Sequence, residues 1–232
     1  MSRPDIALAW AVAGQVRFEQ AVAGCGDLRA PSRLPGWTRG HVVTHVARNA
    51  DGLVRLLTWA RTGIETPMYP STQARAADIE AGAGRPLAEQ LADVRSTGAA
   101  FAAAAQQLST QHWEATVRTR RGPVRACIVA WMRVREVWLH LVDLDAGAQL
   151  DVLPEDIATE LVRDVAGWMH TRVPVRIEMQ LPGGERVGFG PEGSAPVPVS
   201  GSPQELAGWL TGRCPGDRLT APADLPELPS WI

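Results

Sequence analysis

Residues 131–144, WMRVREVWLHLVDL, combine an apolar helical pattern with two side chains that can bind a metal ion. Glu136 and His140 are four residues apart, so on an α-helix they lie on the same face, about 6 Å from each other. A carboxylate buried without a partner costs several kcal/mol, which a divalent cation or an arginine can offset. Taken alone, the stretch favours a glutamate–arginine pair beside a buried histidine over a metal site.

A second stretch, GWTRGHVVTHVARNA, places His41, His45 and Asn49 on one face of a helix at four-residue spacing. Imidazole and carboxylate ligands with an open fourth position are what a catalytic zinc site needs, and helix bundles build such sites from facing helices. The two stretches together therefore predict a metal site that includes Glu136 and His140. The residues alone leave His41 and His45 as alternatives for the third ligand.

Hydrophobic periodicity predicts the elements that would position these side chains. Four long helices with apolar stripes are typical of a four-helix bundle. They are expected at residues 4–23, 39–61, 86–108 and 125–144, with a short helix at 72–81. Thr38 is the expected N-cap of the second helix, and Arg121-Gly122 is expected to form a turn within a polar segment.

The pattern changes after Gly147. We expect a helix at 155–170, strands at 173–181 and 185–190 joined by a PGG turn, another short strand at 196–201, and a helix at 203–212. The predicted fold class is therefore α+β with two domains. Residues 1–150 would form an all-helical metal-binding bundle, and residues 151–232 a smaller α+β domain.

The composition excludes several classes of protein. A chain of 232 residues with 45% hydrophobic and 21% charged residues is an ordinary globular protein, and a net charge of −2 predicts no binding to nucleic acid or to an anionic membrane. No apolar run reaches the ~18–20 residues of a membrane span, and no signal peptide is evident. The three scattered cysteines indicate reduced thiols and a cytoplasmic protein. All 23 basic residues are arginine, which excludes lysine chemistry.

Both metal-site stretches carry a family resemblance. LPGWTRGHVVTHVARNADGLVRLLTWARTGIETPMYPS and WMRVREVWLHLVDL closely resemble the mycothiol-dependent maleylpyruvate isomerases, which belong to the wider group of DinB-like metalloenzymes. LTGRCPGD and the closing ELPSWI resemble the C-terminal pattern of the same family. The resemblance extends across the chain, and it implies a DinB-like four-helix bundle joined to a smaller α+β domain similar to sterol carrier proteins.

The resemblance implies three zinc ligands, His45 from the second helix and Glu136 and His140 from the fourth. It favours His45 over His41, which becomes a neighbour of the site. Zn²⁺ is the expected metal, although the same ligands also suit iron, manganese or nickel. Asp143 can accept a hydrogen bond from the other ring nitrogen of His140, or it can serve the helix end instead.

The implied cosubstrate is mycothiol, a small thiol, and the implied reaction converts maleylpyruvate to fumarylpyruvate. The metal would generate the thiolate, which adds to the cis double bond and leaves after rotation. A dianionic substrate needs a cationic anchor, and Arg213 in the TGRC motif is the predicted catalytic residue. Arg133 and Arg135 are expected to have structural roles. Cys214 is not expected to be a nucleophile, because the enzyme would use an external thiol.

Two other functions compete with this hypothesis. A thiol S-transferase would use the same fold and metal to attach mycothiol, or another small thiol, to an electrophile. A non-catalytic metal-binding protein would keep the bundle without the reaction. The expected partners are a small thiol and a dicarboxylate-type substrate, with neither nucleic acid nor a membrane.

Overall fold

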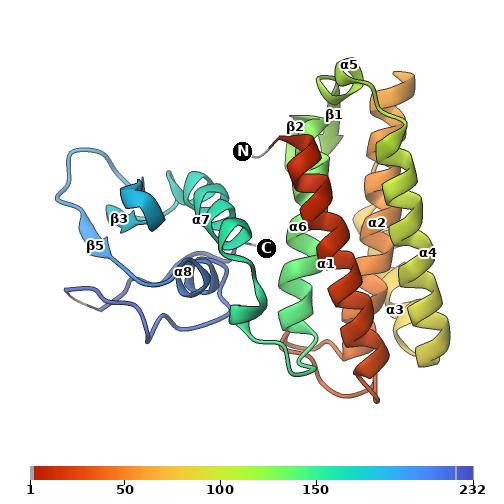
Figure 1. Ribbon diagram of the computed structural model, residues 1–232, viewed down its shortest axis with the longest axis horizontal. Coiled ribbons are helices and arrows are strands. Elements are labelled where there is room, and N and C mark those ends of the chain that lie inside the picture. The colour runs from red at the N-terminus through yellow and green to blue at the C-terminus, as the bar shows by residue number, and fades with distance from the viewer. Residues whose placement is uncertain (1–2, 223, 232) are drawn as a thin grey trace. The chain divides into compact units, whose positions relative to one another are not determined.

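The computed structural model describes residues 3–222 and 224–231, and the chain divides into two compact units (Figure 1). One unit extends to Ala148 and the other begins at Gln149. The first unit contains α1 (Pro4–Gly24), α2 (Arg39–Thr62), α3 (Thr72–Ala83), α4 (Leu87–Gln106), α5 (Thr110–Trp113), β1 (Thr116–Thr119), β2 (Gly122–Arg125) and α6 (Cys127–Asp143). The second contains η1 (Leu150–Val152), α7 (Glu155–Met169), β3 (Ile177–Gln180), η2 (Pro182–Gly184), β4 (Arg186–Phe189), β5 (Val197–Val199) and α8 (Pro203–Leu210).

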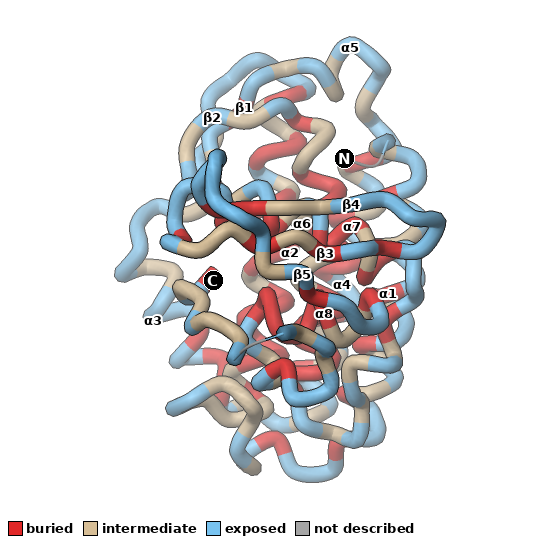
Figure 2. The backbone as a smooth tube through the Cα atoms, turned by 90° about the vertical axis from the view of Figure 1, so that its left-hand side faces the viewer, coloured by how far each residue is buried: buried red, intermediate tan, exposed pale blue. Residues whose placement is uncertain are grey.

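The first unit is a four-helix bundle of α1, α2, α4 and α6, to which the shorter helices α3 and α5 are added. Helices α1 and α2 each contact both α4 and α6, and α3 lies against α2. Buried and exposed segments alternate along these helices, as amphipathic sequences require (Figure 2). The core side chains include Phe18, Leu53, Leu57, Val94, Phe101, Trp131 and Val134. The expected four-helix bundle is confirmed.

Helices α1 and α6 approach closely because α1 carries a glycine at their contact. A Cβ atom added to Gly14 would lie 2.5 Å from Cγ2 of Val137 and 2.6 Å from Nε1 of Trp138. The same indole nitrogen donates a hydrogen bond of 3.0 Å to the carbonyl oxygen of Trp10. The glycine and this hydrogen bond hold α6 against α1.

The ends of α2 follow the sequence signals. Oγ1 of Thr38 accepts a hydrogen bond from the backbone N–H of His41, so the predicted N-cap is confirmed. The helix ends at Gly63, whose φ of 73° lies in the left-handed region that favours glycine.

Two elements of the first unit were not expected. Helix α5 and the antiparallel hairpin β1–β2 lie at the end of the bundle where α6 begins (Figure 1). Only the turn at the tip of the hairpin was predicted. Its strands have four residues each, and their side chains are mostly exposed or half-buried, so the segment lacks the apolar alternation that would reveal strands.

The second unit contains a three-stranded sheet in the order β4-β3-β5. Strands β3 and β4 form the expected antiparallel hairpin, and β5 pairs with β3 in parallel. Helix α7 buries an apolar face that includes Ile157, Leu161 and Val165, and it contacts β4 and α8. The two-domain α+β fold class is therefore confirmed. In the described part of the chain, no helix is long and apolar enough to cross a membrane.

Replacing Gly14 by alanine is expected to lower the free energy of unfolding by about 1–3 kcal/mol, because the new methyl group overlaps α6. Gly24 in the same helix is the control, since a Cβ added there would have no described atom within 4 Å other than those of its chain neighbours and its own helix backbone. Urea denaturation of both variants measures the difference. Equal stability of Gly14→Ala and the wild type would contradict the close contact between α1 and α6.

Candidate metal centre

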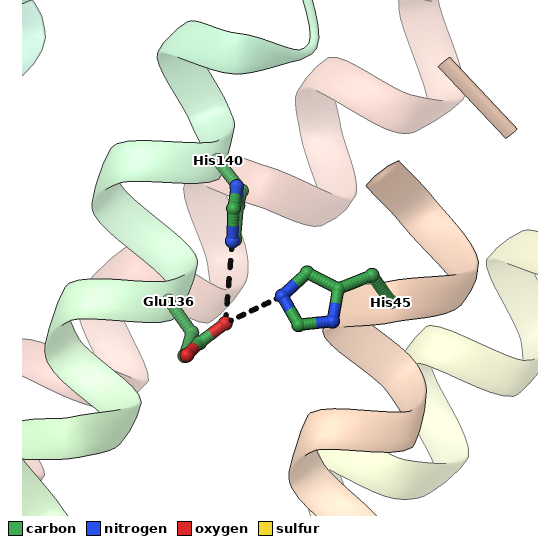
Figure 3. A group of neighbouring side chains, drawn as sticks. All are labelled: His45, Glu136 and His140. Atoms are coloured by element: carbon green, nitrogen blue, oxygen red, sulfur yellow. Dashed lines mark ion pairs between the residues drawn. The ribbon is translucent and has the colours of Figure 1, made fainter. Parts of the chain in front are cut away.

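Three potential ligands from two helices converge inside the bundle. Helix α2 carries His45, and α6 carries Glu136 and His140; Figure 3 shows the three side chains turned toward one another. Oε2 of Glu136 lies 3.0 Å from Nε2 of His45 and 3.3 Å from Nε2 of His140. One ligand atom from each residue can be chosen so that all lie within 4.8 Å of one another. The structure thus brings together the three side chains that the family resemblance implied.

The shared carboxylate oxygen fits the role of a metal ligand. Oε2 of Glu136 is buried and, among the described residues, no group forms a hydrogen bond of good geometry to it, although two ring nitrogens face it. Two imidazoles and one carboxylate are a ligand set of catalytic zinc sites. The Glu136 side chain keeps 18% of its exposure, against 8% for His45 and 11% for His140. Glu136 is therefore the most solvent-exposed of the three side chains.

The three groups differ in their preferred protonation states in the metal-free protein. Burial raises the pKa of Glu136, but the facing imidazoles of His45 and His140 outweigh it and hold that pKa well below its ordinary value. Burial lowers the pKa of His45. Burial also opposes the charged form of His140, yet Asp143 and Glu136 raise the pKa of that imidazole to about 9. A cation would therefore meet an ionised carboxylate, one neutral imidazole and one protonated imidazole at pH 7.

A buried aspartate orients the second histidine. Oδ2 of Asp143 lies 2.8 Å from Nδ1 of His140, and Asp143 is only 1% exposed. A hydrogen bond donated by Nδ1 means that, once His140 loses its other proton, the free lone pair is on Nε2, which faces Glu136. Carboxylates that accept from the outer nitrogen of a ligating histidine raise its basicity and fix its ring orientation. This contact is the first of the two roles that the sequence allowed for Asp143.

His41 lies outside the group, because it belongs to the helix cap. Its Nδ1 accepts a hydrogen bond of 3.1 Å from the backbone N–H of Thr38, and its Nε2 lies 3.2 Å from a carboxylate oxygen of Glu80. The ring of Trp37 lies beside both histidines, with its centroid 6.1 Å from that of His41 and 5.5 Å from that of His45. His41 is thus a neighbour of the site with a structural function.

A buried arginine ties the two metal-site helices together. Nη1 of Arg133 donates to the carbonyl oxygen of Val46 at 2.8 Å and to Oδ1 of Asn49 at 3.1 Å. Its Nη2 donates to Oε1 of Gln15 on α1 at 2.7 Å. Burial lowers the pKa of Arg133 to about 10, so the guanidinium stays charged at neutral pH. The structural role expected for Arg133 is seen here, and Asn49 takes part in the same contact between helices.

Sequence reasoning missed two residues beside the site. Nη2 of Arg75, on α3, lies 3.0 Å from Nδ1 of His45. The guanidinium carbon lies 5.7 Å from the centre of the Tyr69 ring. Tyr69 is the only tyrosine of the chain and lies within the stretch that resembles the family, which was an available signal. Arg75 gave no such signal, because it is one of 23 basic residues and meets His45 only through the packing of α3 on α2.

Arg213 and Cys214 lie in the second unit, directly after α8 and its C-cap. Nη1 of Arg213 donates a hydrogen bond of 2.8 Å to the carbonyl oxygen of Thr211. Burial raises the pKa of the Cys214 thiol, which disfavours the thiolate and agrees with the expectation that this cysteine is not a nucleophile. The substrate-binding role of Arg213 stays a prediction.

Both units match models of one protein family. Residues 11–145 match the mycothiol maleylpyruvate isomerase N-terminal domain, and residues 152–230 match the C-terminal domain of the same family. The chain belongs to the mycothiol maleylpyruvate isomerase family. This confirms both the predicted family and the prediction that the protein is an enzyme.

Solved structures support the family assignment along the whole chain. The crystal structure of the mycothiol-dependent maleylpyruvate isomerase has 32% sequence identity and a TM-score of 0.89, with all of both chains covered. A variant of that enzyme with one histidine replaced by alanine has 31% identity, the same TM-score and the same coverage. No curated protein matches the chain.

Substitution of the three ligands tests the metal site directly. His45→Ala, Glu136→Gln and His140→Ala are each expected to weaken zinc binding by more than about 100-fold, because each removes one of three ligands. His41→Ala is the matched control on the same helix and is expected to bind zinc as the wild type does. Metal analysis after equilibration with buffered zinc measures the effect. Wild-type zinc content in the ligand variants would refute the assignment.

Metal binding is also expected to release about one proton per site at pH 7. The pKa of His140 is about 9 in the metal-free protein, so this imidazole is protonated at pH 7 and must lose its proton to bind a cation. The lowered pKa values of His45 and Glu136 mean that neither releases a proton there. Metal affinity should therefore rise with pH up to about 9 and then level off.

Calorimetric titration in buffers of different ionisation enthalpy counts the released protons. The Asp143→Asn variant is the control, because losing the carboxylate lowers the pKa of His140 and should reduce proton release at pH 7. Zinc binding without proton release by the wild type at this pH would contradict the protonated state of His140.

Proposed function

We propose that the protein is a zinc- and mycothiol-dependent isomerase that converts maleylpyruvate to fumarylpyruvate. The observation that carries the proposal is the convergence of His45, Glu136 and His140, with an accessible carboxylate, in a chain whose two units match this family. Three protein ligands leave a further coordination position for a small molecule. Imidazole and carboxylate ligands support zinc.

The three ligands would hold the ion through Nε2 of His45, a carboxylate oxygen of Glu136 and Nε2 of His140. A bound zinc ion supplies positive charge that lowers the pKa of a thiol from about 8.5 and so makes the thiolate available at neutral pH. Asp143 keeps the proton of His140 on Nδ1, which maintains Nε2 as a ligand. Burial of the two imidazoles limits competition by water at the ligand atoms.

The thiolate would act as a reversible nucleophile. Its sulfur forms a bond to one carbon of the cis double bond, and the π electrons move onto the conjugated carbonyl oxygen to give an enolate. The former double bond is now single and rotates. The enolate then re-forms the double bond as the trans isomer, the carbon–sulfur bond breaks, and the thiolate leaves unchanged. The reaction needs neither an oxidant nor a reductant, and no thiol is consumed.

The substrate would also need cationic groups to bind its two carboxylates. Arginine suits this task because its planar fork can donate two parallel hydrogen bonds to one carboxylate. Arg213 of the second unit is the residue that the family's C-terminal motif supports. Its hydrogen bond to the carbonyl oxygen of Thr211 uses Nη1.

Turnover with a limiting amount of thiol tests the proposal. The zinc-loaded protein is expected to convert many equivalents of maleylpyruvate to fumarylpyruvate per mycothiol, and proton NMR identifies the trans product. Protein treated with a chelator and assays without thiol are the controls, and both should be inactive. Consumption of one thiol per substrate with a stable thioether product would instead establish an S-transferase. Zinc binding without any reaction of maleylpyruvate would identify a non-catalytic metal-binding protein.

A further inference from the structure

Arg75 is a partly buried cation at the edge of the metal centre whose contacts are with neutral groups. Its Nη2 lies 3.0 Å from Nδ1 of His45, and its guanidinium carbon lies 5.7 Å from the centre of the Tyr69 ring. Within the described residues, no carboxylate forms an ion pair with Arg75. Arg85, which follows α3, instead pairs with Asp93. A half-buried guanidinium that has no carboxylate partner can bind an anion, because its charge is partly desolvated and its N–H groups can donate to a negatively charged partner.

The neighbouring tyrosine shows that this cation and the metal-site carboxylate share one environment. Burial raises the pKa of Tyr69, the Glu136 carboxylate raises it further, and the Arg75 guanidinium opposes both. Tyr69 therefore lies within electrostatic range of both charged groups. Arg75 consequently flanks the same small region as the ligands.

The two nitrogens of His45 face different partners. Nε2 faces Glu136 and Nδ1 faces Arg75. When Nε2 is a metal ligand, the neutral imidazole carries its proton on Nδ1. Arginine has no acceptor, so the guanidinium and this N–H would then be two donors directed at each other. The contact cannot persist as a hydrogen bond, and an anion that accepts from the guanidinium would replace it.

We propose that Arg75 binds a carboxylate of the substrate beside the His45–Glu136–His140 group. The inference rests on the proposed function for the identity of that substrate. A dicarboxylate carries two negative charges, and Arg75 would bind one of them from the first unit. Glu136 is the only charged ligand, so a bound divalent ion would keep a net positive charge. The Arg75 guanidinium adds a second positive charge, and the two together favour binding of an anion.

Binding of maleate tests this role without turnover. Maleate is a cis-dicarboxylate that lacks the ketone, and no thiol is present in the experiment. Calorimetric titration of the zinc-loaded full chain is expected to show that Arg75→Gln raises the Kd about 10- to 100-fold, the usual loss for one hydrogen bond to a charged group. Arg75→Lys should give an intermediate Kd, because it keeps the charge and loses the planar fork.

Arg61→Gln is the matched control, since Arg61 is an exposed arginine in the last turn of α2. Its Kd for maleate should equal that of the wild type. Zinc content, measured on every variant, should also equal the wild-type value. A second expectation is that maleate binds more weakly to the metal-free protein, in which Nδ1 of His45 can hold the guanidinium.

Three results would overturn the inference. These are wild-type affinity for maleate in Arg75→Gln, loss of zinc from Arg75→Gln, and no binding of millimolar maleate by the zinc-loaded wild type. Loss of zinc would show that Arg75 supports His45 instead of binding an anion.

The proposed function can fail independently of this inference. Maleate binding that depends on Arg75, in a protein that does not isomerise maleylpyruvate, would refute the proposed reaction and support the anion site. Isomerisation with an unchanged KM and an unchanged maleate Kd in Arg75→Gln would support the proposed reaction and refute the anion site at Arg75.

Discussion

A carboxylate placed between two imidazoles inside a helix bundle is the interaction on which the site depends. Glu136 is ionised because His45 and His140 face it, and burial alone would have kept it neutral. The same oxygen meets both rings and forms no good hydrogen bond within the described residues. A structure that only had to hide this charge would pair it with an arginine. Here the guanidinium one turn away, Arg133, donates to neutral oxygens instead.

The position of Arg133 explains how two helices keep their ligands opposed. Arg133 precedes Glu136 by one turn on α6 and donates to the carbonyl oxygen of Val46, which follows His45 on α2. Desolvating a guanidinium is costly, and its hydrogen bonds to α2 and α1 offset that cost only in one register. A shift of α2 by one turn would break those bonds and separate His45 from Glu136. The buried cation thus links the stability of the bundle to the geometry of the site.

Much of the architecture was predictable, and each failure has its own physical reason. Apolar spacing located the long helices to within a few residues, because a buried stripe must repeat with the helical period. The hairpin β1–β2 was missed because the side chains of Thr116–Thr119 and Gly122–Arg125 are mostly exposed or half-buried. The sequence therefore lacks the alternation of apolar and polar residues that indicates a strand. The parallel pairing of β5 with β3 was also not evident, since it joins segments that are not adjacent in sequence.

The amino-acid sequence by itself determined the pair Glu136 and His140, because helix geometry places residues four apart on one face whatever surrounds them. It also determined the cap at Thr38, which is equally local. The choice between His41 and His45 could not be made from spacing, since both lie on the same face of the helix, four residues apart. Only the tertiary structure shows that Glu80 lies against His41 while His45 faces Glu136 on α6. Arg75 likewise reaches the site only through the packing of α3 on α2, because contacts between distant segments depend on side-chain packing that no local pattern encodes.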